Sequence, residues 1–207
     1  KCGAKVGPFA DYSIFLFTLL RKQAAKPPPM RQYLLLLGIS SLLFAAPLSA
    51  QLAPDFHFVD TEGNRHRLYH ALDQDYVVLL TLFFVDCEPC REALPELRSI
   101  YQDYSDDNLL VWSLSDRDPD SLLRQYAEQA QAPFILSGTD GLADEAIELL
   151  TDNFPFFGFP TIAVICPDRS ISWDIWPYSP GAPEWRQPIE SCGLQESLPP
   201  YQPLEPS

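Results

Sequence analysis

Two closely spaced cysteines are the part of this 207-residue sequence best suited to covalent chemistry. Cys87 and Cys90 enclose only Glu88 and Pro89. Residues three apart on a helix lie on the same side, so the two thiols are close enough to bond. Pro89 stiffens the turn between them. The pair can therefore cycle between dithiol and disulfide without rearranging the surrounding fold.

Two other uses of this spacing are a zinc site and a purely structural disulfide. A zinc site would need two further ligands. The segment after residue 50 offers His57, His66 and His70 near its start and no second close pair of cysteines. A disulfide that closes so short a loop constrains little of the unfolded chain and stabilises weakly. Redox chemistry is therefore the favoured interpretation, and neither a metal ion nor a cofactor is expected.

The flanking sequence places the cysteine pair at the junction of a strand and a helix. Residues 76–85 form a continuous apolar run, which indicates a strand buried on both faces of a sheet. Apolar residues then recur at helical spacing over 88–104, and Pro95 should kink that helix. Cys87 would lie where the helix dipole and unpaired N–H groups lower the pKa of a thiol.

The remaining periodicities predict an α/β fold. Strands are predicted on both sides of a turn at 61–64, at 109–115, at 133–136 and as a hairpin of 161–166 and 171–176; helices are predicted at 122–130, 142–150 and 182–191. Asp118 is expected to be a helix N-cap, with Pro119 as the first helical residue. This order requires a central mixed β-sheet with helices on both faces. The proline-rich tail, 193–207, is expected to be disordered.

The first fifty residues have the pattern of an export signal. Met30 is the only methionine, and it is followed by Arg31, an apolar run over 34–46 and a small-residue end at 48–50. This pattern predicts a signal peptide at 30–50 that is cleaved after Ala50, with an uncleaved membrane anchor as the alternative. Residues 1–29 are interpreted as an upstream extension outside the working protein, although the apolar patch at 14–20 could instead contact a membrane. The domain is expected to span 51–192.

The charge distribution disfavours nucleic acid as a partner. Residues 51–207 contain eight arginines, no lysine and 27 acidic residues, a formal net charge of −19. Phosphate backbones and anionic lipids would repel such a body. A basic partner would be compatible with this charge, but a solvated acidic surface that keeps the protein soluble is the simpler interpretation.

The segment 53–191 resembles the TlpA/ResA-like branch of the thioredoxin superfamily, whose members are exported and exchange thiols with disulfides. The matching features are the strand that leads into "CEPC", Pro95 five residues beyond Cys90, and "FPT" at Phe159, Pro160 and Thr161. "CEPC" itself is similar to the motif of members that reduce apocytochrome c. The resemblance implies a thioredoxin-like fold.

The resemblance also implies roles for several residues. Pro160 would be cis and face the active disulfide, with the backbone of Phe159 and Thr161 gripping the substrate chain; the alternative is an ordinary proline at a strand edge. Export places Cys166 and Cys192 in an oxidising compartment. Because the last helix of such a fold packs on the sheet, these two cysteines could form a second disulfide. The alternative is two buried free thiols.

The sequence departs from this family pattern at two positions. Asp86 stands where a tryptophan usually precedes the first cysteine, and Thr81 stands where many thioredoxins have a buried acid that assists proton transfer. Thr81 cannot act as a general base. Glu88 is then the nearest candidate proton relay, although it could equally be a solvated glutamate at a helix start.

Together these features predict an exported thiol–disulfide oxidoreductase, in a bacterial periplasm, or anchored to the inner membrane if the signal is uncleaved. Cys87 would attack a protein disulfide and Cys90 would resolve the mixed disulfide, with electrons supplied by a membrane or soluble dithiol donor. A monomeric reductase is expected. One alternative is a peroxiredoxin-like peroxidase; the threonine that usually lies three residues before the reactive cysteine of that group is replaced by Phe84, which disfavours it. The other alternative is a redox-inactive binding module, which only Asp86 favours.

Overall fold

The computed structural model describes residues 51–173, 185–196 and 198–205. The predicted signal peptide at 30–50 and the upstream extension at 1–29 lie outside these residues. The same is true of 174–176 in the predicted hairpin and of 182–184 in the predicted last helix. Within the described ranges, none of the helices combines the length and the apolar character needed to cross a membrane.

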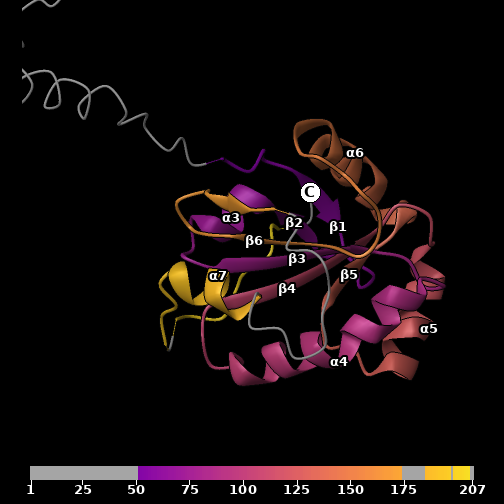
Figure 1. The fold of residues 1–207 in the computed structure, drawn as a ribbon, viewed down its shortest axis with the longest axis horizontal. Helices are drawn as coiled ribbons and strands as arrows, with labels where there is room; N and C mark the ends of the chain where they lie inside the picture. Colours follow the sequence, from indigo (N-terminus) through magenta and orange to yellow (C-terminus); the bar gives the residue numbers. More distant parts are fainter. Residues whose placement is uncertain (1–50, 174–184, 197, 206–207) are drawn as a thin grey trace, which may run out of the picture. The chain divides into compact units, whose positions relative to one another are not determined.

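A five-stranded mixed sheet forms the centre of the structure (Figure 1). In spatial order its strands are β5 (Ile135–Ser137), β4 (Leu109–Ser115), β3 (Val77–Phe83), β6 (Thr161–Ile165) and β7 (Ile171–Ser172). Strands β3, β4 and β5 are parallel, whereas β6 runs antiparallel to β3 and β7 runs antiparallel to β6. Thr161 pairs with Leu82, so the chain enters β6 beside the C-terminal end of β3.

Helices cover both faces of this sheet, as the sequence predicted (Figure 1). They are α3 (Leu68–Leu72), α4 (Glu88–Asp103), α5 (Asp120–Ala130), the short 3₁₀ helix η1 (Thr139–Gly141), α6 (Ala143–Asn153) and α7 (Arg186–Ser191). Side chains of α3 and α6 pack on one face, and side chains of α4 and α7 pack on the other. The arrangement is a thioredoxin-like α/β fold, which confirms the predicted fold class.

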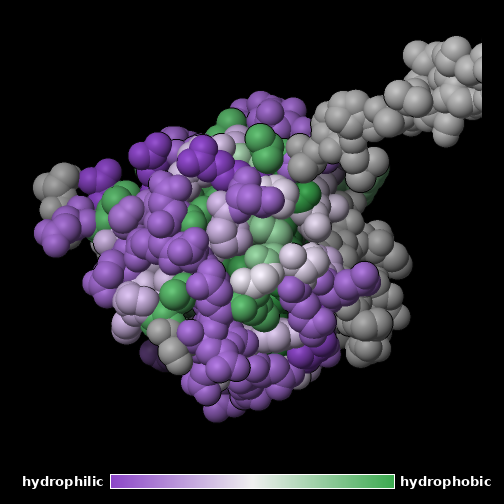
Figure 2. Space-filling model, turned by 90° about the vertical axis from the view of Figure 1, so that its left-hand side faces the viewer, coloured by the Kyte–Doolittle hydropathy of each residue, from purple (hydrophilic) through white to green (hydrophobic). Residues whose placement is uncertain are grey.

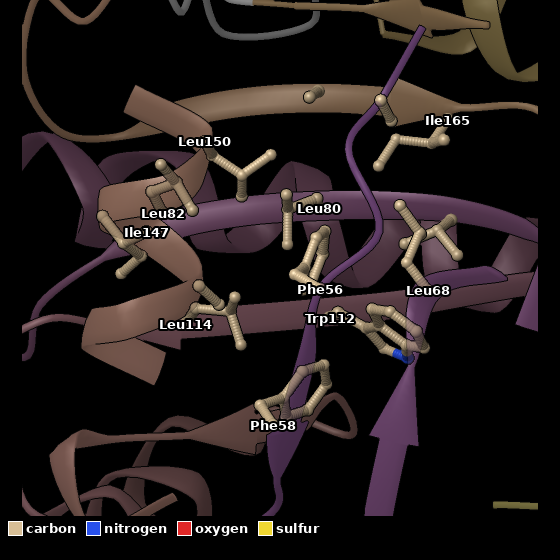
Figure 3. Packing of buried hydrophobic residues seen from close by; sticks show 14 of the residues in the cluster. Phe56, Phe58, Leu68, Leu80, Leu82, Trp112, Leu114, Ile147, Leu150 and Ile165 are labelled. Carbon is tan, nitrogen blue, oxygen red and sulfur yellow. The ribbon is translucent and has the colours of Figure 1, made fainter. Parts of the chain in front are cut away.

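The alternation of β3 explains how one strand serves two cores. All seven of its residues are buried, and successive side chains of a strand point to opposite faces. Leu80 and Leu82 join the core that contains Phe56, Trp112 and Leu114 (Figure 3), whereas Val77 and Leu79 join the core under α4. Because β3 is apolar on both faces, it holds its C-terminal end, and the cysteines that follow, in a fixed position.

A separate two-stranded hairpin precedes the sheet. It consists of β1 (His57–Val59) and β2 (Arg65–Arg67), joined by a turn in which Gly63 has a φ of +92°. Asp60 Oδ1 stabilises the turn by accepting hydrogen bonds from the backbone N–H groups of Glu62 and Asn64, at 2.9 and 2.8 Å. The two strands were predicted, but α3 was not, because the apolar alternation in the sequence continues into Leu68.

Two predictions about local structure are wrong. Asp118 is not the N-cap of α5: that helix begins at Asp120, and its N-cap is Pro119, which makes no side-chain capping bond. The carboxylate of Asp118 is turned instead toward the loop after β3. The tail was expected to be disordered, but residues 198–205 pack against the hairpin. Leu204 N donates to Arg65 O at 2.8 Å, and the ring of Tyr201 stacks on the buried His66.

Figure 2 shows a face of the molecule on which hydrophilic residues predominate and apolar residues are confined to small patches. This is consistent with the excess of acidic residues in 51–207. A polar, charged surface of this kind favours solubility.

Candidate active site

Cys87 and Cys90 form a disulfide at the junction predicted from the sequence. Their Cα atoms are 5.2 Å apart. Cys87 is the N-cap of α4, and its Sγ accepts a hydrogen bond from the backbone N–H of Cys90 at 3.2 Å. Pro89 occupies the first turn of the helix, where a missing N–H removes no helical bond. The helix N-terminus thus presents one N–H group and its dipole to the sulfur of Cys87.

The segment before β6 lies beside the disulfide, and its Pro160 lines the same cavity as Cys90. The Phe159–Pro160 peptide bond is cis. Phe159 packs against the apolar cluster that contains Cys87 and Cys90. Thr161 Oγ1 donates to the carbonyl of Gly158 at 2.7 Å, which fixes the turn that enters β6. The structure therefore brings together the cysteines and the Phe159–Thr161 segment, which the sequence had placed in one site.

A small cavity lies behind the disulfide. It measures about 20 Å³ and is lined by apolar side chains together with Cys90, Pro160, Thr81 and Ser113. This volume is enough for about one water molecule. Thr81 Oγ1 and Ser113 Oγ are 2.6 Å apart and both residues are buried. The side chains that line the cavity include hydroxyl groups but no carboxylate, in agreement with the absence of an acid at position 81.

Tyr126 is the one phenol that lines this cavity. Burial raises its pKa above 10, and the nearby charges of Arg98 and Arg91 offset only part of that effect. The phenol is therefore protonated at neutral pH. It can donate a hydrogen bond, but it cannot serve as a base.

Glu88 points into solvent at the start of α4. Its side chain is 72% exposed, and its carboxylate forms an ion pair with Arg91. This hydrogen bond is also the main reason why the pKa of Arg91 is raised. The arrangement favours the interpretation of Glu88 as a surface glutamate at a helix start. Its role as a proton relay stays a prediction.

One residue that supports the site was not predicted from the sequence. Asp118 is buried, and its Oδ2 accepts hydrogen bonds from the backbone N–H of Val85 at 2.8 Å and from Ser115 Oγ at 2.7 Å. Val85 lies two residues before Cys87. Asp118 therefore holds the loop between β3 and α4 in place. Because Asp118 directly precedes Pro119, the sequence pattern is that of a helix N-cap, and the contact of Asp118 with the loop before Cys87 was not predicted.

A second disulfide lies at the end of the sheet away from the first. Cys166 directly follows β6 and Cys192 directly follows α7; their Cα atoms are 5.1 Å apart. The bond ties α7 to the central sheet. Within the described ranges, no group of three or more histidine, cysteine or acidic side chains could hold a metal ion.

Comparison with known protein families shows which family the chain belongs to. The family model described as "AhpC/TSA family" matches residues 50–173, which include both active-site cysteines and the cis-proline. The chain belongs to the AhpC/TSA family. No curated protein matches the chain.

Solved structures extend the likeness of this AhpC/TSA-family chain to its fold. A thioredoxin-family thiol:disulfide interchange protein from Chlorobium tepidum is 16% identical, with a TM-score of 0.60, over 71% of this chain and 99% of that one. The thioredoxin domain of a thiol-disulfide oxidoreductase from Bacteroides vulgatus is 18% identical, with a TM-score of 0.56, over 69% and 95%. A thiol-disulfide oxidoreductase from Bacteroides fragilis is 17% identical, with a TM-score of 0.55, over 68% and 98%.

The geometry defines what this member of the AhpC/TSA family can do chemically. A two-cysteine disulfide at a helix N-terminus, beside a cis-proline in a thioredoxin fold, is the arrangement of a thiol–disulfide oxidoreductase. The two sulfurs can be reduced and reoxidised without displacing the strand or the helix that hold them. The protein is accordingly an oxidoreductase of the thioredoxin superfamily.

Proposed function

We propose that the protein reduces disulfide bonds in other proteins, with Cys87 as the attacking thiolate and Cys90 as the resolving thiol. The observation that carries this proposal is the Cys87–Cys90 disulfide at the N-terminus of α4, beside the cis Phe159–Pro160 bond. Cys87 Sγ accepts a hydrogen bond from the backbone N–H of Cys90, so Cys87 is the better stabilised of the two cysteines as a thiolate.

The proposed cycle has two exchange steps. The Cys87 thiolate attacks one sulfur of the substrate disulfide, which breaks the S–S bond, releases one substrate thiolate and forms a mixed disulfide. The Cys90 thiolate then attacks Cys87 Sγ, which releases the second substrate thiolate and leaves the Cys87–Cys90 disulfide. The substrate gains two electrons and two protons. A membrane or soluble dithiol donor returns the protein to its dithiol form.

The proposed direction of electron flow rests on charge near Cys87. Asp86 and Glu88 flank it in sequence, and negative charge disfavours a thiolate, whereas the helix N-terminus favours one. Strong oxidants of this superfamily owe their potential to a stabilised thiolate. Weaker stabilisation here favours a reductase with a potential nearer about −270 mV than about −120 mV. Equilibration with dithiothreitol redox buffers measures this directly, and a value above about −180 mV would reverse the proposed direction.

We also propose that the protein acts outside the cytoplasm as a monomer, with apocytochrome c as one candidate substrate. The support is the signal-like pattern of 30–50 and the similarity of "CEPC" to the motif of reductases for that substrate. Intact mass of protein recovered from an exporting host tests the first part. A mature chain that begins at Gln51 supports it; a chain that retains 30–50 supports a membrane anchor.

Insulin reduction by dithiothreitol, run beside a hydrogen peroxide consumption assay, tests the proposed activity. The proposal expects accelerated precipitation of insulin chains and no consumption of peroxide above the rate with dithiothreitol alone. Peroxide consumption without insulin reduction would instead indicate a peroxidase. If neither reaction occurs, the protein is a redox-inactive binding module.

A further inference from the structure

An aromatic surface borders the active-site disulfide and is built from three separate segments. Phe84 precedes Cys87 by three residues, Phe156 and Phe159 precede β6, and Arg117 lies in the loop between β4 and α5. The Phe159 ring meets Phe84 edge to face at 5.4 Å and Phe156 at 5.1 Å between centroids. We call Phe84, Phe156, Phe159 and Arg117 the aromatic ledge.

Arg117 joins the ledge through its guanidinium group. The group lies 4.2 Å from the ring centroid of Phe84 and 4.9 Å from that of Phe159. Such cation–π contacts hold a cation over an aromatic face. Asp116 forms two hydrogen bonds with the same guanidinium, at 2.8 and 3.2 Å. The charge of Arg117 is therefore already balanced, and its main contribution to the surface is shape.

Both active-site cysteines are largely covered by neighbouring side chains. Cys87 is only 3% exposed and Cys90 only 6%. Phe84 and Phe159 pack against the cluster that contains both cysteines. Phe84 and Phe159 therefore form part of the surface that surrounds the active-site cysteines.

The segment 154–159 contains both buried and exposed aromatic side chains. Phe154 is buried in the core, whereas Phe156 is 39% exposed and Phe157 is 80% exposed. Exposed aromatic side chains that are grouped at a site are typical of surfaces that bind a partner. Phe157 follows Phe156 directly in the chain and adds a second exposed aromatic side chain to this segment.

An exposed carboxylate also adjoins the active-site disulfide in the chain. Asp86 directly precedes Cys87 and is exposed. The positive charge of Arg91 acts on Asp86, but Arg91 is bonded to Glu88. An exposed carboxylate next to the attacking cysteine favours a cation at the matching place on a substrate.

We infer that the ledge, Phe157 and Asp86 select the substrate: a disulfide-bearing polypeptide segment with a large aromatic side chain on one side of the reacting cysteine and a lysine or arginine on the other. The aromatic side chain would lie on the ledge and the cation would pair with Asp86. This inference deepens the proposed reductase function and rests on it. The two exchange steps are unchanged.

Symmetrical peptide disulfides test the inference. The dithiol form of the full protein is mixed with the disulfide dimer of a peptide containing Phe-Cys-Lys, or of matched peptides containing Ser-Cys-Lys, Phe-Cys-Glu or Ser-Cys-Glu. The rate of thiol release is compared with that for the small neutral disulfide of 2-mercaptoethanol. The wild type is expected to reduce the Phe-Cys-Lys dimer at least about tenfold faster than the Ser-Cys-Glu dimer, the equivalent of about 1.4 kcal/mol.

Variants separate the two contributions. F156A/F157A is expected to lower the Phe over Ser preference about fivefold or more. D86K is expected to reverse the Lys over Glu preference, which a general loss of stability could not do. L149A, which trims an exposed leucine on α6, should keep both preferences.

The outcomes distinguish this inference from the function on which it rests. If the wild type reduces all four peptides and the small disulfide at similar rates, the reductase function stands and the inference is wrong. If it reduces none of them, the proposed function fails and the inference fails with it. A preference that survives F156A/F157A and D86K would also overturn the inference.

Discussion

Asp118 Oδ2 accepts a hydrogen bond from the backbone N–H of Val85 at 2.8 Å, and this bond ties the loop after β4 to the loop that leads to Cys87. Hydrogen bonds to a buried charged group are worth about 1.5–3 kcal/mol each. We expect D118A to lower the free energy of unfolding by about 2 kcal/mol or more and to slow insulin reduction. Urea unfolding and the insulin assay measure the two effects.

The conservative variant D118N serves as the control for this prediction. Asparagine keeps an acceptor for the Val85 N–H but loses the charge, so its loss of stability should be smaller than that of D118A. Equal stability of D118A and the wild type would mean that the bond does not hold the loop.

Asp60 makes the stability of the hairpin depend on pH. Burial acts to raise the pKa of Asp60, but hydrogen bonds with His66 and Asn64 outweigh it and lower the pKa below 3.8. A lowered pKa in the folded state stabilises the protein above the unfolded value, and that stability is lost as the pH falls through the folded value. We therefore expect the free energy of unfolding to decrease from about pH 4 downward.

D60N should reduce this dependence. Its free energy of unfolding should be lower than that of the wild type at pH 7 by about 1–3 kcal/mol, and it should change less on acidification below pH 4. D106N, which alters an exposed aspartate, should keep the wild-type slope. If the free energy of unfolding fell equally for the wild type and D60N between about pH 4 and about pH 2, Asp60 would not be the source of the pH dependence.

The Cys166–Cys192 disulfide should stabilise the fold without taking part in the reaction. It links residues 26 positions apart, and closure of a loop of that length is worth about 3–4 kcal/mol in the chain-entropy treatment. C166S/C192S should lower the free energy of unfolding by about that amount and retain insulin reduction. Peptide mapping of the non-reduced wild type should show the two cysteines linked; alkylation of both after unfolding without reductant would contradict this.

Because the ion pair between Glu88 and Arg91 is exposed, we expect removal of the Glu88 charge to have a small effect on the rate of insulin reduction. E88Q should leave the rate of insulin reduction within about twofold of the wild type and should not move the pH at which the rate is half-maximal. A displaced pH profile would instead support Glu88 as the proton relay. E92Q provides a matched surface substitution one turn further along α4.

The elements that position the site could be predicted because their apolar patterns are long. Strand β3 and helix α4 carry enough periodic residues to fix both their type and the place of Cys87 between them. The "FPT" motif located the second half of the site before β6. What holds these parts together depends on contacts between distant segments, such as Asp118 with Val85, and no local pattern records those contacts.

The order of the C-terminal tail could not be predicted from its composition. Its proline content suggested disorder, yet Tyr201 stacks on His66 and its hydroxyl lies 3.2 Å from His66 Nδ1. Tyr76 donates a hydrogen bond to the carbonyl of Pro199. The composition of a segment does not reveal that another part of the chain offers it an aromatic surface.

Trapping of the mixed disulfide tests whether Cys87 is the attacking thiolate. A C90A variant in the reduced state is incubated with a disulfide-bearing protein such as insulin, quenched with an alkylating agent and separated without reductant. We expect a covalent complex through Cys87 that dithiothreitol releases, and no such complex with C87A. A complex that forms equally well with C87A, or no complex with C90A, would contradict the assignment of Cys87 as the attacking thiolate.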